Sequence, residues 1–352
     1  MKLMSKLKIL VPSQWGVYQR SEDKQTQIPF IARFAFLSSW KNAKVKARWV
    51  ERTYNDSQKK GTWQIVADPP SSRCIHSCIS VPVGNFDILV RIDLRGKKRR
   101  KKNFQTVENV GIGEIFVMVG QSNAANSGTA RLRPKHNEVR AMTKKGWQIA
   151  DDPQPFASNT KGSPWTVMGD ILFEQLNIPI GVISAAVGGS SVAEWQEDNN
   201  NYQNFIRLLN KLRERGCKKS QLPRAILWHQ GETDSRDELP AEQYVTLLKK
   251  LIENTSRDIC KESQSIPWIV ALAAFHTDTS QTAIDAIISA QKQVIMDEEL
   301  DYVYKGPTTE DLLGLDWRAP DLVHFNKNGL KEHGRRWAQT IMKIFFMNDI
   351  NY

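Results

Sequence analysis

The pattern of hydrophobic and polar positions along the chain changes near Gly111. Before that residue, short segments alternate or cluster apolar, aromatic and β-branched residues, as in FIARFAF, KVKARWVERTY, GTWQIVAD and FDILVRIDL. Segments rich in turn-forming residues separate them, and short strands divided by such turns are typical of antiparallel β structure. The pattern predicts a small β-sandwich-like accessory domain over residues 1–110.

After Gly111, near-continuous apolar runs alternate with amphipathic stretches. The runs are EIFVMVG, IPIGVISAAVGG, RAILWHQGE, IPWIVALAAF and LDYVYKG. The stretches between them place apolar residues three and four positions apart, which predicts helices. Strands that are apolar throughout and alternate with helices predict an α/β fold, with a doubly wound parallel sheet covered on both faces, over residues 111–352. In such sheets ligands bind at the carboxyl ends of the strands.

Composition is ordinary for a soluble globular protein. The 352 residues are 40% hydrophobic and 25% charged, and the length favours two domains. The longest apolar run, residues 268–275, is far shorter than the roughly 18 residues of a membrane span. Lys6 and Lys8 interrupt the apolar start of the chain, so we expect no export signal and a cytoplasmic location.

Positive charge is concentrated in the first domain. Residues 1–110 hold 22 Lys and Arg against 8 Asp and Glu, a net charge of +14, whereas the rest of the chain is at −3. Much of the excess lies in RGKKRRKK, residues 95–102. Such a run can bind an acidic polymer, but no aromatic residues interleave it for stacking on nucleic acid. We favour a solvated hairpin tip and expect no nucleic-acid partner.

The cysteines give no sign of a metal centre. The four residues Cys74, Cys78, Cys217 and Cys260 are too scattered for a disulfide framework. No second pair lies at the spacing of a zinc site, so we expect buried thiols and neither a metal nor an organic cofactor.

Polar residues follow the predicted strands where parallel strands would bring them together. GQSN follows the first strand, GGSSVAEW the second and WHQGETD the third, and APDLVHF precedes the last predicted helix. A serine hydroxyl attacks an acyl carbon when a base within reach accepts its proton. Ser122 is the candidate nucleophile, His324 the base, and Asp321, three residues earlier, the group that orients His324.

A negative charge on the reacting oxygen would need hydrogen-bond donors. The backbone N–H groups of Ser122 and Gly189 and the side-chain amide of Gln230 are the candidates for this oxyanion hole. We interpret Gln121, Asn123, Glu232 and Asp234 as residues that brace the site or bind substrate. Trp195 has two open interpretations, since it could stack on a sugar ring or belong to the core.

In their order and spacing these four segments resemble the SGNH-hydrolase superfamily, and within it the sialate O-acetylesterase and acetylxylan-esterase branch. The matching residues are Gly120 to Asn123, Gly188 to Trp195, Gln230 to Asp234 and Asp321 to His324. The resemblance covers residues 111–345 and implies a flavodoxin-like, three-layer α/β/α catalytic domain. It also implies a Ser122–His324–Asp321 triad and an oxyanion hole of Ser122, Gly189 and Gln230. The basic N-terminal domain is not something that the resemblance predicts.

The sequence therefore predicts a serine carbohydrate esterase that removes O-acetyl groups from a sugar or glycan through an acyl-serine intermediate. An acidic carbohydrate is one candidate substrate. Two alternatives stay open. The same triad could transfer the acyl group to another hydroxyl, as an O-acyltransferase does. The basic N-terminal domain could also bind glycan or nucleic acid with the catalytic fold idle, although a binding protein has no need for all three triad residues.

Overall fold

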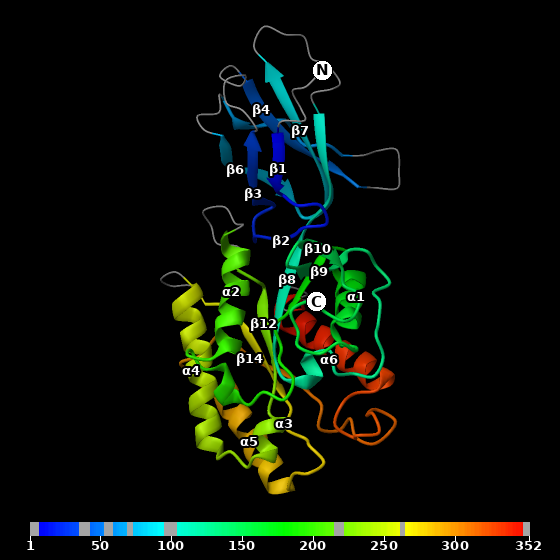
Figure 1. Ribbon diagram of the computed structural model, residues 1–352, viewed down its shortest axis with the longest axis vertical. Coiled ribbons are helices and arrows are strands. Elements are labelled where there is room, and N and C mark those ends of the chain that lie inside the picture. The colour runs from blue at the N-terminus through cyan, green and yellow to red at the C-terminus, as the bar shows by residue number, and fades with distance from the viewer. Residues whose placement is uncertain are drawn as a thin grey trace.

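The computed structural model describes residues 7–34, 43–52, 59–68, 73–94, 104–214, 222–260 and 265–347. Two parts follow one another along the long axis of the molecule, an N-terminal β-sandwich and a larger α/β part (Figure 1). The run at residues 95–102, predicted as a hairpin tip, lies outside the described residues.

Two sheets form the N-terminal β-sandwich. One sheet has the antiparallel order β1 (Leu7–Val11), β3 (Gln25–Phe34) and β6 (Cys74–Pro82). The other contains β5 (Gln64–Ala67), β4 (Ala43–Glu51), β7 (Gly84–Leu94), the first half of β8 (Phe104–Gly120) and the short β2 (Val17–Gln19). Alternate side chains of each strand point inward, as with Ile28 and Phe30 of β3 and Ile88 and Val90 of β7, and they form one core.

Strand β8 joins the sandwich to the α/β part. The predicted domain boundary at residue 110 falls inside this strand. Ile112 still packs in the sandwich core, whereas Ile115 packs in the core of the next part. Between them the fully buried Glu114 carboxylate pairs with Arg20, which follows β2, and with Arg224 Nε at 2.7 Å. A buried charge needs such partners, so this cluster fixes the junction.

The central sheet of the α/β part confirms the predicted doubly wound fold. Its order is β10 (Gly146–Ile149), β9 (Val139–Thr143), β11 (Ile180–Ser184), β8, β12 (Ala225–His229), β13 (Trp268–Leu272) and β14 (Val303–Thr308). All neighbouring pairs are parallel except β10 with β9. The five predicted apolar runs are strands β8, β11, β12, β13 and β14, whereas β9 and β10 were not predicted.

Helices cover both faces of this sheet (Figure 1). One face packs against α2 (Asn200–Glu214), α4 (Ala241–Ile259) and α5 (Gln281–Ile295), and the other against α1 (Trp165–Leu176) and α6 (Lys327–Phe345). Side chains of β8 alternate between the two cores, with Val117 in the first and Met118 in the second. Strand β8 runs out of the sandwich and ends at Gly120. The carboxyl edge of the central sheet is therefore the edge that lies farthest from the sandwich.

Three further expectations concern membranes, metals and thiols. None of the helices in the described ranges is long and apolar enough to cross a membrane. Those ranges also contain no group of three His, Cys, Asp or Glu side chains arranged to hold a metal ion. The expectation of buried thiols is wrong for Cys74, which is exposed, and Cys78 is disulfide-bonded rather than a free thiol.

Candidate active site

The turn after β8 presents Ser122. Gly120 has φ +122, and a Cβ at this position would lie 2.0 Å from the backbone oxygen of His229 on the neighbouring β12. Glycine is therefore required where the strand turns away. The backbone N–H of Gln121 donates to that same oxygen at 2.9 Å, and a single 3-10 turn, η3 (Ser122–Ala124), begins at the serine.

Ser122 and His324 line one pocket, although they are 202 positions apart in the sequence. The pocket has a volume of about 260 Å³ and lies at the carboxyl ends of β8 and β12. The residues that line it are Gln121, Ser122, Asn159, Gly188, Gly189, Thr233, Arg236, His276, Val323 and His324. The predicted nucleophile and base thus share one cavity, and Gly189 lies in its wall.

Asp321 orients His324. Its Oδ2 lies 2.8 Å from Nδ1 of His324, and its Oδ1 accepts hydrogen bonds from the backbone N–H groups of Val323 and His324 at 2.9 Å each. Burial raises the pKa of Asp321, but these hydrogen bonds outweigh burial and leave the pKa below its usual value. The carboxylate therefore stays ionised, and it directs Nε2 of His324 away from itself.

Two backbone N–H groups are available at the pocket wall. Ser122 is the first residue of its 3-10 turn, so its N–H has no acceptor within the turn. Gly189 has φ +74, and a Cβ there would meet no atom within 4 Å, so the backbone faces open space. Among the hydrogen bonds of the described residues, neither N–H has an acceptor. Both fit the predicted role of oxyanion donors.

The structure corrects the third predicted donor, Gln230. Its side chain is fully buried and does not line the pocket. An amide nitrogen carries two hydrogens. Nε2 of Gln230 already faces Oε1 of Gln121 at 3.1 Å, the backbone oxygen of Ser190 at 3.2 Å and a carboxylate oxygen of Asp234. No hydrogen is left for a reacting oxygen, so Gln230 holds the site together from behind.

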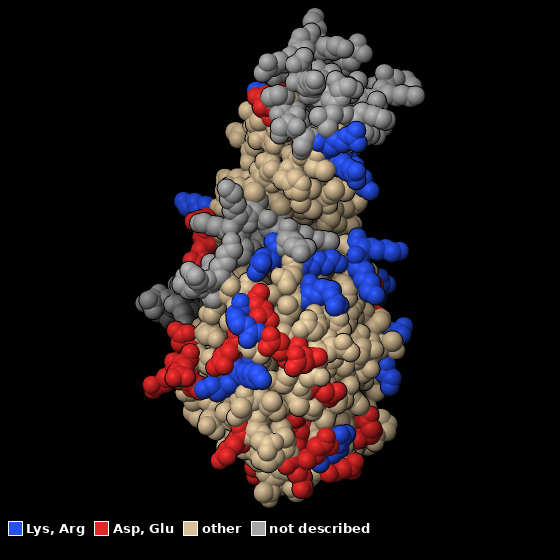
Figure 2. Space-filling model, turned by 60° about the vertical axis from the view of Figure 1, so that its left-hand side comes forward, with Lys and Arg blue, Asp and Glu red and all other residues tan. Residues whose placement is uncertain are grey.

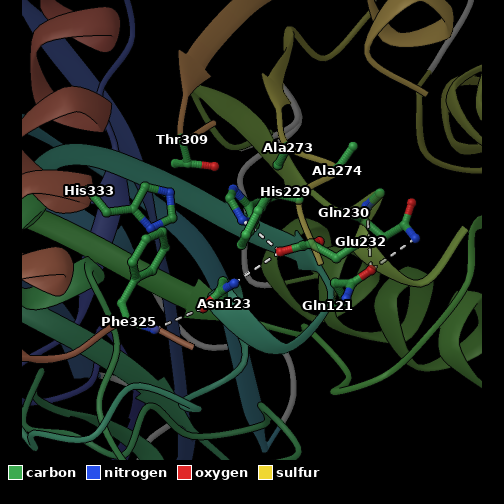
Figure 3. Close-up of polar contacts among 12 residues, drawn as sticks. Gln121, Asn123, His229, Gln230, Glu232, Ala273, Ala274, Thr309, Phe325 and His333 are labelled. Carbon is green, nitrogen blue, oxygen red and sulfur yellow. Dashed lines mark hydrogen bonds and ion pairs between the residues drawn. The ribbon is translucent and has the colours of Figure 1, made fainter. Parts of the chain in front are cut away.

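Gln121 and Asp234 brace the two walls of the pocket. Oε1 of Gln121 accepts from Nε2 of Gln230 and from the backbone N–H of Thr233 at 3.1 Å, which ties the nucleophile turn to the end of β12 (Figure 3). Asp234 accepts from the backbone N–H of Val192 at 3.1 Å and so holds the loop that contains Gly189. Burial raises the pKa of Asp234 to about 6.

Trp195 belongs to the core, which decides between its two interpretations. Its side chain is fully buried at the end of the 3-10 turn η4 (Val192–Trp195). The ring lies edge-on to that of Trp228, with 5.6 Å between centroids, and its Nε1 donates to Oγ of Ser190 at 2.9 Å. No face of the ring is open to a sugar.

Asn123 joins the turn that begins at Ser122 to the loop that carries His324 (Figure 3). Its Nδ2 donates to the backbone oxygen of Val323 at 3.2 Å, and its Oδ1 accepts from the backbone N–H of Phe325 at 3.3 Å. These are the two neighbours of His324 in the chain. Nδ2 also donates to Oε1 of Glu232 at 3.0 Å. Asn123 therefore fixes the position of His324 relative to Ser122.

Glu232 is buried behind Asn123 and faces His229. The distance from Oε1 of Glu232 to Nε2 of His229 is 3.4 Å, and both side chains are almost completely buried. Burial raises the pKa of Glu232, but the interactions with His229 and Asn123 outweigh it and hold the pKa at about 2. Glu232 is thus a buried carboxylate that supports Asn123 and does not reach the pocket.

Six residues of the pocket wall were not predicted as site residues: Asn159, Gly188, Thr233, Arg236, His276 and Val323. His276 follows β13, and its Nδ1 accepts from the backbone N–H of Asp278 at 3.2 Å. Asn159 lies in the loop before α1, and no motif marks it. For Thr233, Arg236 and His276 the sequence does hold a signal, because each lies within a few residues of the carboxyl end of a strand.

A family model decides the affiliation of the chain. The model of the carbohydrate esterases described as sialic acid-specific acetylesterases matches residues 112–343, about two thirds of the sequence. The chain belongs to this family. The match covers the central sheet and all of the predicted motifs.

Relatives agree with the family and the fold. A probable carbohydrate esterase of Arabidopsis thaliana is 25% identical over 186 residues, which is 46% of this chain and 69% of that protein. The solved structure of an Arabidopsis thaliana protein has a TM-score of 0.55 and 22% identity to this chain. The match covers 66% of this chain and 98% of that protein. A carbohydrate acetylesterase from Xanthomonas citri has a TM-score of 0.58 at 14% identity and covers 96% of this chain and 75% of its own, so its fold match extends over the N-terminal sandwich.

Proposed function

We propose that this carbohydrate esterase removes O-acetyl groups from a sugar with Ser122 as nucleophile, His324 as base and Asp321 as the residue that orients the base. The observation that carries the proposal is that Ser122 and His324 line one pocket while Asp321 holds Nδ1 of His324 at 2.8 Å. The pocket lies at the carboxyl edge of the sheet, and the family to which the chain belongs acts on acetylated carbohydrate.

The reaction has two halves. Nε2 of His324 accepts the hydroxyl proton of Ser122 while Oγ bonds to the acetyl carbon, and the N–H groups of Ser122 and Gly189 stabilise the oxyanion. The C–O bond to the sugar breaks, and His324 returns the proton to the sugar oxygen. Water, deprotonated by His324, then attacks the acetyl-serine, releases acetate and restores the hydroxyl of Ser122.

Acetate release from acetylated sialic acid, acetylated xylan and a small aryl acetate tests this proposal. Hydrolysis of at least one sugar ester is the expected result, and the ranking of the substrates defines the sugar. The same assay with added sugar acceptors separates hydrolysis from transfer. Formation of a new sugar ester in place of free acetate, or no release from any substrate, would contradict the hydrolase.

Asp321→Asn should lower kcat by on the order of 10²–10⁴-fold, because an amide at this position no longer stabilises the imidazolium or selects the tautomer of His324. Steady-state kinetics with the aryl acetate measure the loss. Asp316→Asn, an exposed carboxylate of the same loop, is the matched control and should retain wild-type rates. Equal rates for Asp321→Asn and Asp316→Asn would remove Asp321 from the triad.

Asn123→Ala should lower kcat by about 10–100-fold with little change in KM, because a base that is misplaced by a fraction of an ångström slows proton transfer without weakening substrate binding. The split between kcat and KM is the informative readout, and thermal unfolding of the variant reports whether the fold is kept. A rise in KM at unchanged kcat would instead make Asn123 a substrate ligand.

A further inference from the structure

A second, larger cavity lies beside the catalytic pocket. Its volume is about 820 Å³, within the roughly 300–1,000 Å³ that is usual for ligand sites. Its walls come from α2, the loop that contains Phe156, the turn between β9 and β10, and the chain that follows β11. Neither the motifs nor the proposed triad involves this cavity.

The cavity is lined by positive charge and amides. Lys144, Arg207 and Lys211 contribute three cations, and none of the described residues that line the cavity is acidic. Lys211 is held in place, because its Nζ donates to the backbone oxygens of Thr143 at 3.3 Å and Lys144 at 3.4 Å. Four further lining residues carry amides, Asn201, Gln203, Asn204 and Asn210. Nη1 of the exposed Arg207 donates to Oδ1 of Asn204 at 2.6 Å. Cations together with amides suit a ligand that carries a carboxylate and hydroxyl groups.

Phe156 brings an aromatic ring into this polar cavity through an uncommon backbone conformation. Its φ is +70, in the left-handed region that a bulky residue rarely adopts. Nζ of Lys211 lies 5.6 Å from the centroid of the ring. Such conformations persist where the surrounding structure holds them, and they cluster at ligand sites. An aromatic ring beside a fixed cation offers a surface for the body of an acidic sugar.

The wall between the cavity and the catalytic pocket is thin. Val187 lines the cavity and the next residue, Gly188, lines the pocket, so the two Cα atoms are about 3.8 Å apart. On the other side of the wall Phe156 lines the cavity and Asn159 the pocket. The backbone N–H of Gly188 donates to Oγ of Ser158 at 2.8 Å, which joins the two segments. A ligand that spans both spaces needs to cross only this ridge.

We infer that the cavity binds a carboxylate-bearing sugar unit of the same glycan whose acetyl group enters the catalytic pocket. Lys144 and Arg207 pair with the carboxylate, and the ring of Phe156 packs against the sugar. Lys and Arg side chains also gather across the middle of the face drawn in Figure 2, below the sandwich, which favours the approach of an acidic glycan. Only the placement of the acetyl group in the catalytic pocket rests on the proposed function, because binding of the acidic sugar in the cavity requires no catalysis.

Calorimetry with unacetylated trigalacturonate, compared with its neutral methyl ester, tests the site without any reaction. The acid should bind the wild-type protein about tenfold more tightly than the ester, with an affinity that falls as salt rises. The double variant Lys144→Gln/Arg207→Gln should bind the acid about tenfold more weakly. Lys250→Gln, an exposed lysine of α4, is the matched control and should bind as the wild type does.

Two kinetic measurements separate this inference from the proposed function. With an acetylated oligogalacturonate, the double variant should show a KM raised by about tenfold at unchanged kcat, whereas its rates on the aryl acetate should stay at the wild-type level. Equal binding of acid and ester, unchanged binding by the double variant, or an unchanged KM would overturn the inference. If the wild type does not hydrolyse the aryl acetate, the proposed esterase function is contradicted, whereas the calorimetric binding result still tests the inference.

Discussion

Ser122→Ala should abolish nearly all acetate release, with a loss of kcat on the order of 10⁴–10⁶-fold, because no other group of the pocket can form the acyl intermediate. Ser122 lies at the start of η3 and lines the pocket, so the free energy of unfolding of the variant should stay within about 0.5 kcal/mol of the wild-type value. The measurement is acetate release from the best sugar ester, with thermal unfolding beside it.

Ser184→Ala is the matched control for that experiment. Ser184 ends β11, is buried and donates to the backbone oxygen of Ala124 at 3.3 Å, so it lies behind the nucleophile turn without lining the pocket. It should lower activity by less than about tenfold, since only one internal hydrogen bond is lost. Retention of wild-type activity by Ser122→Ala would disprove the acyl-serine mechanism, even though the chain has the fold of the family.

The central strands that the sequence predicts correctly are those that pack mainly against apolar side chains. Strands β11, β12 and β13 and the last part of β8 are apolar along nearly their whole length, because helices cover both faces of the sheet. Strand β9 was missed because it contains Arg140, which a sequence pattern places in solvent. In the fold Arg140 is fully buried, and its guanidinium donates to the backbone oxygen of Asn109 at 2.7 Å and to Oδ1 of Asn85 at 2.9 Å. Partners 31 and 55 positions away leave no local signal.

The same distinction separates the site residues whose predicted places hold from Gln230, whose predicted role was wrong. Ser122, Gly189 and His324 could be predicted because parallel strands bring their carboxyl ends to one edge. The orientation of an amide such as that of Gln230 depends on Gln121 and Asp234, whose side chains the sequence does not place. An amide with all its hydrogens used inside the fold has the same sequence as one aimed at substrate, and only the contacts tell them apart.

Glu232→Gln should lower the free energy of unfolding by about 3 kcal/mol at neutral pH, because the buried carboxylate of Glu232 accepts a hydrogen bond from Asn123 and faces His229, and a neutral amide replaces these interactions only in part. Glu232 has a pKa of about 2 in the folded protein against 4.5 for an ordinary glutamate. A carboxyl with a lowered pKa stabilises the fold above its unfolded pKa, and this contribution is lost as the pH falls from 4.5 through about 2. The difference between wild type and variant should therefore shrink on acidification.

Urea denaturation of both proteins from about pH 7 down to about pH 3 measures this difference. Glu299→Gln is the matched control, because that side chain is 85% exposed, and it should change the free energy of unfolding by no more than about 0.5 kcal/mol at any pH. Because Glu232 also supports Asn123, its variant should lose activity through kcat, in the same way as Asn123→Ala. A stability loss that does not depend on pH, or one equal to that of Glu299→Gln, would show that Glu232 is held by packing and not by its charge.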